Sequence, residues 1–212
     1  MCGRFRIQLT KPWETLLTTL AAFQGNGWAV IGCDSRASDE GGRAMDLATP
    51  KVVANGEYLI AVSGASRGGN ISQFGWTPPA VPKSITQEGL DKFMTRTFIP
   101  SLRHAFQDAG YDAKDDGDAA FQDSNLIIMI RGIIYPIFED YSWDREVRNI
   151  YYGGSGGDVA LGAMVALGID KLKDNPEKAL KVIEKSVAVA CEWDVYTKAP
   201  IITRIQYGKK LK

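Results

Sequence analysis

TTLAAFQGNGWAVIGCDSR, residues 18–36, is the stretch of sequence that decides the fold of this chain. Two apolar runs, 18–23 and 28–33, flank Gln24-Gly25-Asn26-Gly27, and Asn-Gly between such runs is a strong signal for a β-hairpin. The first strand begins with a hydroxyl residue, Thr18, and the second ends at a carboxylate, Asp34. Because paired antiparallel strands share their ends, the hairpin places the two side chains at one edge of a sheet.

Length and composition are those of one soluble globular domain. The chain has 212 residues, 45% of them apolar, and a formal net charge of zero, so it lacks the basic footprint of a nucleic-acid-binding protein. No apolar run reaches the ~18 residues that a membrane helix needs, and residues 1–17 lack the apolar core of a secretory signal. Three cysteines without CxxC spacing favour a reducing compartment, the cytoplasm, and no zinc site.

The rest of the chain alternates between strand and helix patterns. A second hairpin is expected around Asn55-Gly56, and a polar turn over 39–43. Apolar residues at helical spacing predict helices over 87–109, kinked at Pro100, and over 159–172. Asn175 is expected to cap a third helix ending near Cys191. The strands expected are Val52–Ala54, Tyr58–Ser63, Asn125–Arg131, Ile133–Phe138, Ile150–Tyr152 and Ile201–Tyr207. This order fits two antiparallel sheets covered by helices.

Histidine-dependent catalysis is nearly excluded by composition. The only histidine, His104, falls in a helical pattern beside Leu102 and Phe106, so it is interpreted as a helix-face residue. Without a second histidine, Ser-His-Asp or Cys-His chemistry would have to use His104. A phosphate-binding loop is also not indicated, because no GxxxxGK[ST] sequence is present.

Several short sequences, in order, resemble the threonine peptidases of the proteasome β-subunit family and the bacterial HslV-type peptidase. They are Thr18-Thr19, Asp34-Ser35-Arg36, Lys51, Ser63-Gly64-Ala65, Gly154-Ser155-Gly156 and Asp194-Val195-Tyr196-Thr197. The interval from Thr18 to Asp34 is the family's, whereas that from Asp34 to Lys51 is one residue longer. The resemblance implies an α+β fold, the four-layer αββα sandwich of N-terminal-nucleophile (Ntn) hydrolases, over residues 18–212. Residues 1–17 would be an N-terminal extension or propeptide.

The resemblance also implies a role for each matched residue. Thr18 would be the nucleophile, with its own α-amine as the base, because a threonine hydroxyl attacks poorly unless a base takes its proton. Lys51 would place a positive charge beside it, and Asp34 would hold Lys51. The Gly64 N–H would face the oxyanion. The remaining residues of the expected site are Ser155, Asp194 and Thr197 near the amine, Thr19 and Arg36 as support, and Ala37, Val53 and Val62 in the substrate pocket.

The first seventeen residues leave the activity open. An amide-bonded Thr18 has no free amine, so the chain is a proenzyme, an inactive relative, or a sequence whose start lies too early, with Leu17 in place of an initiator. Two other hypotheses remain: a catalytically inactive, proteasome-like structural subunit, and an N-terminal nucleophile at Cys2 as in SRAP-type proteins and class II glutamine amidotransferases. For the peptidase, the resemblance implies unfolded protein or peptide substrates, a homo-oligomeric ring and an ATP-dependent unfoldase partner. No cofactor, metal, nucleic acid or membrane is expected.

Overall fold

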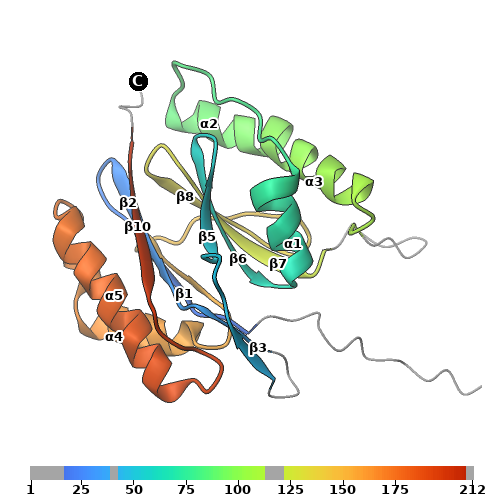
Figure 1. Cartoon of the computed structure of the whole chain (residues 1–212). Helices are drawn as coiled ribbons and strands as arrows, with labels where there is room; N and C mark the ends of the chain where they lie inside the picture. Colours follow the sequence, from blue (N-terminus) through green and yellow to red (C-terminus); the bar gives the residue numbers. More distant parts are fainter. Residues whose placement is uncertain (1–16, 39–42, 113–121, 209–212) are drawn as a thin grey trace, which may run out of the picture.

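The computed structural model describes residues 17–38, 43–112 and 122–208. Two four-stranded antiparallel sheets stack on each other, and helices cover both outer faces (Figure 1). The first sheet has the order β10-β2-β1-β9, and its strands are Leu20–Gln24 (β1), Trp28–Cys33 (β2), Ile150–Gly153 (β9) and Ile202–Tyr207 (β10). The second has the order β5-β6-β7-β8, and its strands are Val52–Asn55, Tyr58–Gly64, Ser124–Ile130 and Ile133–Ile137.

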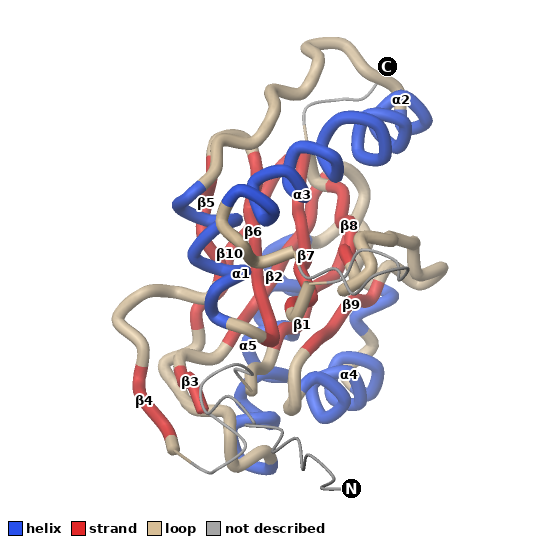
Figure 2. Tube along the Cα trace, turned by 90° about the vertical axis from the view of Figure 1, so that its right-hand side faces the viewer, coloured by secondary structure: helices blue, strands red, loops and turns tan. Residues whose placement is uncertain are grey.

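Helices from two parts of the chain form the outer layers. The second sheet is covered by α1 (Ser66–Asn70), η1 (Ile71–Gly75), α2 (Gln87–Phe93), η2 (Met94–Phe98) and α3 (Ile99–Asp108). The first is covered by α4 (Gly157–Ala166), η3 (Ile169–Lys171) and α5 (Pro176–Trp193). Figure 2 shows the two helix groups on either side of the paired sheets. The architecture is the predicted four-layer sandwich.

Alternation along each strand explains the four layers. In β1, Leu20 and Ala22 face the other sheet, whereas Ala21 and Phe23 face α4 and α5. In β7, Ile127 and Met129 face the first sheet, and Leu126 packs under α2 and α3. Both faces of these strands are buried, so residues 20–23 of β1 and 126–130 of β7 are all apolar instead of alternating with polar residues.

Most predicted element boundaries are confirmed within two residues. The strand Trp28–Cys33 has its predicted limits, and the Asn175 side chain accepts a hydrogen bond from Lys178 N at 3.0 Å, which caps α5. β1, however, begins at Leu20, because Thr18 and Thr19 precede the ladder with β2. The disruption expected from Pro100 takes the form of the wide π-helical turn η2 immediately before it, as proline offers no N–H.

A two-stranded ribbon was not predicted. It pairs β3 (Arg36–Ser38) with β4 (Ala44–Asp46), and it projects from one end of the sandwich (Figures 1 and 2). The polar turn expected over 39–43 connects these strands, and residues 39–42 of it lie outside the described residues. Cys2 and residues 1–16 also lie outside them.

Candidate active site

The Thr18 hydroxyl lies at an edge where the two sheets meet. Thr18 lies two residues before β1 of the first sheet, and Lys51 directly precedes β5 of the second. Lys51 Nζ donates a hydrogen bond to Thr18 Oγ1 at 3.1 Å, and the Thr18 residue is only 1% exposed. The predicted nucleophile and the predicted cation are therefore in direct contact, across the interface between the sheets.

Asp34 organises this contact from the end of β2. Its fully buried carboxylate accepts a hydrogen bond from Lys51 Nζ at 2.6 Å. The backbone N–H groups of Thr19 and Arg36 donate to its two oxygens, each at 2.9 Å, and Lys198 N donates at 3.4 Å. Three backbone donors and one ammonium thus satisfy the carboxylate, so the position of Lys51 Nζ is fixed by the fold.

Burial changes the acid–base properties of the site. Desolvation lowers the pKa of Lys51 below its ordinary value, and the neighbouring Asp34 carboxylate opposes this effect only in part. Burial also raises the pKa of the Cys33 thiol, at the end of β2, to about 11. The Cys33 thiol is therefore protonated at neutral pH, which makes it a poor nucleophile although it adjoins Asp34.

A second hydrogen-bonded group lies beside Thr19. Asp194, at the end of α5, accepts hydrogen bonds from Ser155 Oγ at 2.7 Å and Thr197 Oγ1 at 2.6 Å. The Thr197 hydroxyl donates its only hydrogen to Asp194. In the hydrogen bond of 2.7 Å between Thr19 Oγ1 and Thr197 Oγ1, Thr19 must therefore be the donor. The structure thus brings together Ser155, Asp194 and Thr197 as predicted, and joins them to Thr19.

The glycines around Ser155 hold the Thr18 backbone, a role that the sequence did not indicate. Gly156 N donates to the Thr18 carbonyl oxygen at 3.3 Å. Gly154 has φ +79°, and a Cβ there would lie 2.0 Å from the same oxygen. A Cβ at Gly156 would lie 2.0 Å from Thr19 Oγ1, so only glycine allows this segment to approach the threonine pair.

Two other predicted residues occupy defined positions near the site. Gly64, at the end of β6, has φ +95°, and a Cβ there would lie 2.6 Å from the Asp123 carbonyl oxygen. The fold therefore requires glycine at this position, and the oxyanion role of its N–H stays a prediction. Arg36 supports Asp34 through its backbone, while its side chain reaches Asp46 on β4 at 3.4 Å.

A cavity of about 260 Å³ opens beside the Lys51 side chain. It lies between the segment 47–51, β6 and the α1–η1 segment, and Val62 and Gln73 are among its lining residues. Of the three residues predicted to form the substrate pocket, only Val62 lines it. Ala37 is buried on β3 opposite Met45, and Val53 lies on β5 opposite Ile60.

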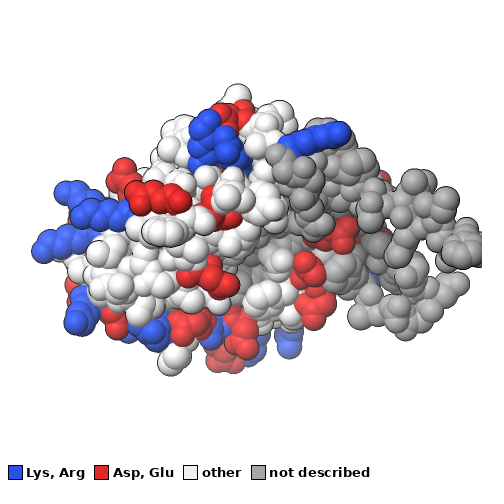
Figure 3. Space-filling view, turned by 90° about the horizontal axis from the view of Figure 1, so that it is seen from below, with Lys and Arg blue, Asp and Glu red and all other residues white. Residues whose placement is uncertain are grey.

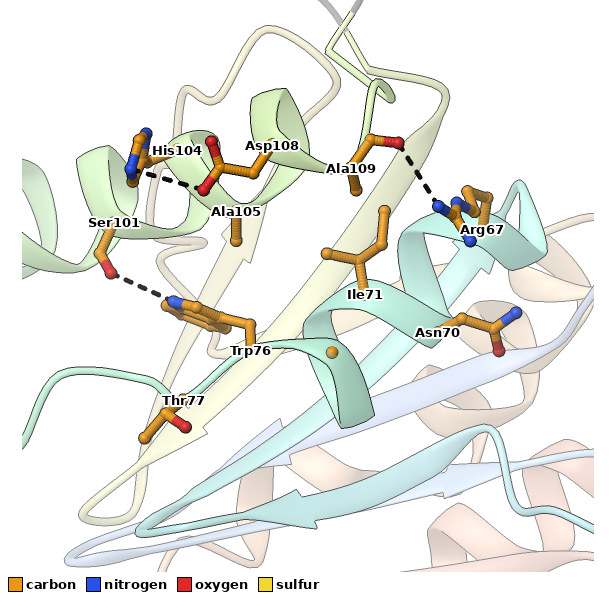
Figure 4. Close-up of a pocket in the computed structure, with 11 residues that line it drawn as sticks. Arg67, Asn70, Ile71, Trp76, Thr77, Ser101, His104, Ala105, Asp108 and Ala109 are labelled. Carbon is orange, nitrogen blue, oxygen red and sulfur yellow. Dashed lines mark hydrogen bonds and ion pairs between the residues drawn. The ribbon is translucent and has the colours of Figure 1, made fainter.

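A larger hollow, of about 560 Å³, lies elsewhere, between α1, η1 and α3. Figure 4 shows its lining: Trp76 Nε1 donates to Ser101 Oγ at 3.1 Å, and His104 pairs with Asp108 at 3.5 Å. None of the predicted site residues lines it. The His104 side chain is 75% exposed on the helix surface, as predicted, and takes no part in the cluster around Thr18.

Within residues 17–38, 43–112 and 122–208, no three His, Cys, Asp or Glu side chains are grouped as a metal site would require. Over the same residues, none of the helices combines the length and the apolar character needed to cross a bilayer. On the face shown in Figure 3, positive and negative side chains are interspersed.

Comparison with protein-family models and with curated proteins gives no match. Solved structures do match over nearly the whole chain. The BPH protein of Thiobacillus denitrificans in complex with epoxomicin has a TM-score of 0.69 at 18% identity, covering 91% of this chain and 100% of that one. The same protein in another structure gives 0.66 at 17% identity, with 91% and 99% covered.

Eukaryotic HslV from Trypanosoma brucei gives a TM-score of 0.59 at 16% identity, with 90% of this chain and 99% of that chain covered. The chain therefore has the fold of these BPH and HslV structures, which confirms the expected four-layer αββα sandwich. At these identities the likeness establishes the fold alone.

Proposed function

We propose that this chain is a threonine-type endopeptidase subunit of a proteasome- or HslV-like protease, with Thr18 as the nucleophile. The observation that carries the proposal is the hydrogen bond of 3.1 Å from Lys51 Nζ to Thr18 Oγ1, with Lys51 held by the buried Asp34 at 2.6 Å. A buried cation beside a hydroxyl favours the alkoxide that attacks a carbonyl.

The chemistry needs the Thr18 α-amine to be released from its peptide bond with Leu17. A free α-amine has a pKa of about 7.7–8.0 and is partly neutral at working pH, so it can accept the hydroxyl proton. Oγ then attacks the peptide carbonyl carbon, the amine proton passes to the leaving nitrogen, and an ester to Thr18 remains. Water hydrolyses this ester and restores the hydroxyl. Gly64 N–H is the proposed donor to the oxyanion.

The contacts of Leu17 bear on this release. Leu17 N donates to the Ser38 carbonyl oxygen at 3.1 Å, so the backbone of the residue before the nucleophile is hydrogen-bonded to the end of β3. We propose that residues 1–17 are an extension that must be removed, and that 18–212 form the hydrolase domain. The substrates proposed are unfolded proteins or peptides, handled by a cytoplasmic homo-oligomeric ring with an ATP-dependent unfoldase.

The experiment compares chains in which a site-specific protease cut immediately before Thr18 frees its amine. The unaltered freed chain should cleave short unfolded peptides and take a label from an electrophilic, threonine-directed inhibitor. Thr18→Ala should abolish both, Thr18→Ser should retain part of the activity, and Lys51→Ala should lose nearly all of it. The freed protein should elute as a species several times 23.2 kDa.

Two outcomes would replace the proposal. If the freed, assembled protein neither cleaves peptides nor takes the label, the chain is a structural subunit of the same fold. If Cys2→Ala in the full chain abolishes a hydrolase activity that Thr18→Ala leaves intact, the nucleophile is Cys2. A monomer at micromolar concentration would contradict the ring.

A further inference from the structure

The cavity beside Lys51 contains one buried side chain with a defined orientation. Gln73, on η1, is 8% exposed, and its Nε2 donates to the carbonyl oxygens of Lys51 at 2.9 Å and Ile60 at 3.0 Å. Carbonyl oxygens only accept hydrogen bonds, so the nitrogen must be the end of the amide that faces them. The Gln73 Oε1 is consequently fixed on the opposite side.

The free side of this amide faces the cavity. Gln73 and Gly69 both line it, and a Cβ built on Gly69 would lie 3.8 Å from Gln73 Oε1. Within the part of the chain that the structure describes, Oε1 accepts no hydrogen bond and is not enclosed by protein atoms. The cavity thus presents one acceptor of fixed orientation. The other side chains that line it are mixed, with Leu47, Val62 and Phe74 apolar and Thr49, Ser66 and Asn70 polar.

We propose that Gln73 is a specificity-determining residue, selecting a substrate side chain that is neutral and ends in a hydrogen-bond donor. This inference rests on the proposed function, in which the cavity beside Lys51 receives the residue before the scissile bond. A donor satisfies Oε1, whereas an apolar side chain of the same length displaces its water and leaves the acceptor unpaired.

Charge excludes the other polar side chains. Among the described residues, Lys51 is the only charged one that lines the cavity, and its ammonium is already bound to Asp34 and Thr18. A substrate carboxylate would meet Oε1, a second acceptor, and a substrate ammonium would be buried without a counter-charge. The three residues Gln, Met and Glu are close in length, so they separate donor, apolar and anionic ends with little change of volume.

The test compares peptides that differ only in Gln, Met or Glu before the scissile bond. For the freed protein, kcat/KM should be roughly tenfold higher for Gln than for Met, and lowest for Glu. Equal or higher rates with Met would overturn the proposal. Gln73→Met should abolish the difference between Gln and Met, but it also removes two hydrogen bonds to the backbone and can impair folding.

Gly69→Ala supplies a variant that leaves Gln73 in place. Its added methyl group meets only contacts of 3.8 Å or more, in a helical segment without positive φ, so the fold should tolerate it. Lying over Oε1, the methyl should reduce the Gln-to-Met ratio to about one. Gly162→Ala, on α4 with nothing within 4 Å of its Cβ, is the matched control and should leave the ratio unchanged.

A binding measurement separates this inference from the proposed function. Acetylated amides of Gln, Met and Glu are titrated by NMR against the chain that is cut before residue 18 and carries Thr18→Ala, which prevents cleavage. The Gln amide should bind tightest, and Gly69→Ala should remove its advantage. If no peptide is cleaved, the proposed function fails while this binding order still decides the role of Gln73. If none of the amides binds, or if Met binds as well as Gln, the role of Gln73 is refuted.

Discussion

Replacing Lys51 by methionine should destabilise the folded protein strongly, whether or not it is an enzyme. The substitution keeps the length of the side chain and removes the ammonium that lies 2.6 Å from Asp34 Oδ1. The two side chains are 4% and 0% exposed, so the carboxylate left behind cannot be hydrated. Breaking a buried pair by removing one partner costs about 3–5 kcal/mol.

This loss is a large part of the stability available to a domain. Total free energies of unfolding are about 5–15 kcal/mol. In a domain of this size, 1 kcal/mol corresponds to about 2–4 °C in Tm, so Lys51→Met should lower Tm by roughly 6–20 °C. The backbone N–H groups of Thr19 and Arg36 still satisfy part of the Asp34 charge, which favours the lower half of this range.

Urea unfolding followed by circular dichroism measures the change, and the chain offers a matched control. Lys92 pairs with Glu88 on the surface of α2, with side chains 56% and 78% exposed. Lys92→Met removes the same ammonium group and should cost no more than ~0.5 kcal/mol. The double variant Asp34→Asn/Lys51→Met should be more stable than the sum of the single losses predicts, by about 2 kcal/mol.

Two results would refute the reasoning. If Lys51→Met costs no more than Lys92→Met, Lys51 and Asp34 do not form a desolvated pair, and the charge assigned to the Thr18 site is not held there. If the single losses simply add, the two side chains do not interact in the folded protein, whatever their individual contributions.

Three further predictions address other parts of the site. Gly156→Ala should separate Thr19 from Thr197 and lower Tm by several degrees, because the added Cβ would lie 2.0 Å from Thr19 Oγ1. Gly162→Ala, on α4, is the control. An unchanged Tm for Gly156→Ala would contradict the close contact between Gly156 and Thr19. Cys33 should resist alkylation at pH 7 until the protein unfolds, since it is fully buried and its pKa is raised to about 11. Mass spectrometry after alkylation with and without urea measures this. Rapid labelling of Cys33 in the native protein would contradict it. The pKa of Lys51 is lowered in the folded protein, so between the folded and the unfolded pKa the unfolded chain binds more protons, and Lys51 adds stability as pH rises through that window. The difference in unfolding free energy between the unaltered chain and Lys51→Met should therefore grow toward alkaline pH. A difference that shrinks would show that the pKa is shifted the other way.

The sequence predicted the sandwich because its local signals agree with each other. Asn-Gly turns, apolar runs of strand length and the Asn175 cap all survive in the structure. The β3–β4 ribbon could not be predicted in this way: each strand has three residues, and all three residues of β4 are exposed. Such strands carry no periodicity that distinguishes them from a polar turn.

The sequence indicated which side chains form the site, but it did not indicate which backbone groups hold them in place. The resemblance to a peptidase family brought Thr18, Asp34 and Lys51 together. Among the described residues, however, three of the four donors to Asp34 are backbone N–H groups, which no residue type reveals. Gln73 was missed for a related reason. Its amide is bound to the carbonyl oxygens of Lys51 and Ile60, so its orientation depends on tertiary packing alone.

Thr19 joins the two hydrogen-bonded groups of the site. Its backbone N–H binds Asp34, which holds Lys51 against the Thr18 hydroxyl, and its own hydroxyl binds Thr197 in the group around Asp194. The Thr18 carbonyl is meanwhile held by Gly156 N–H. Thr18 is thus fixed through Lys51 and β5 on one side, and through the segment after β9 on the other. Because these contacts come from both sheets, the position of the hydroxyl depends on how the sheets pack together, and substitutions at that interface should affect the site without touching Thr18.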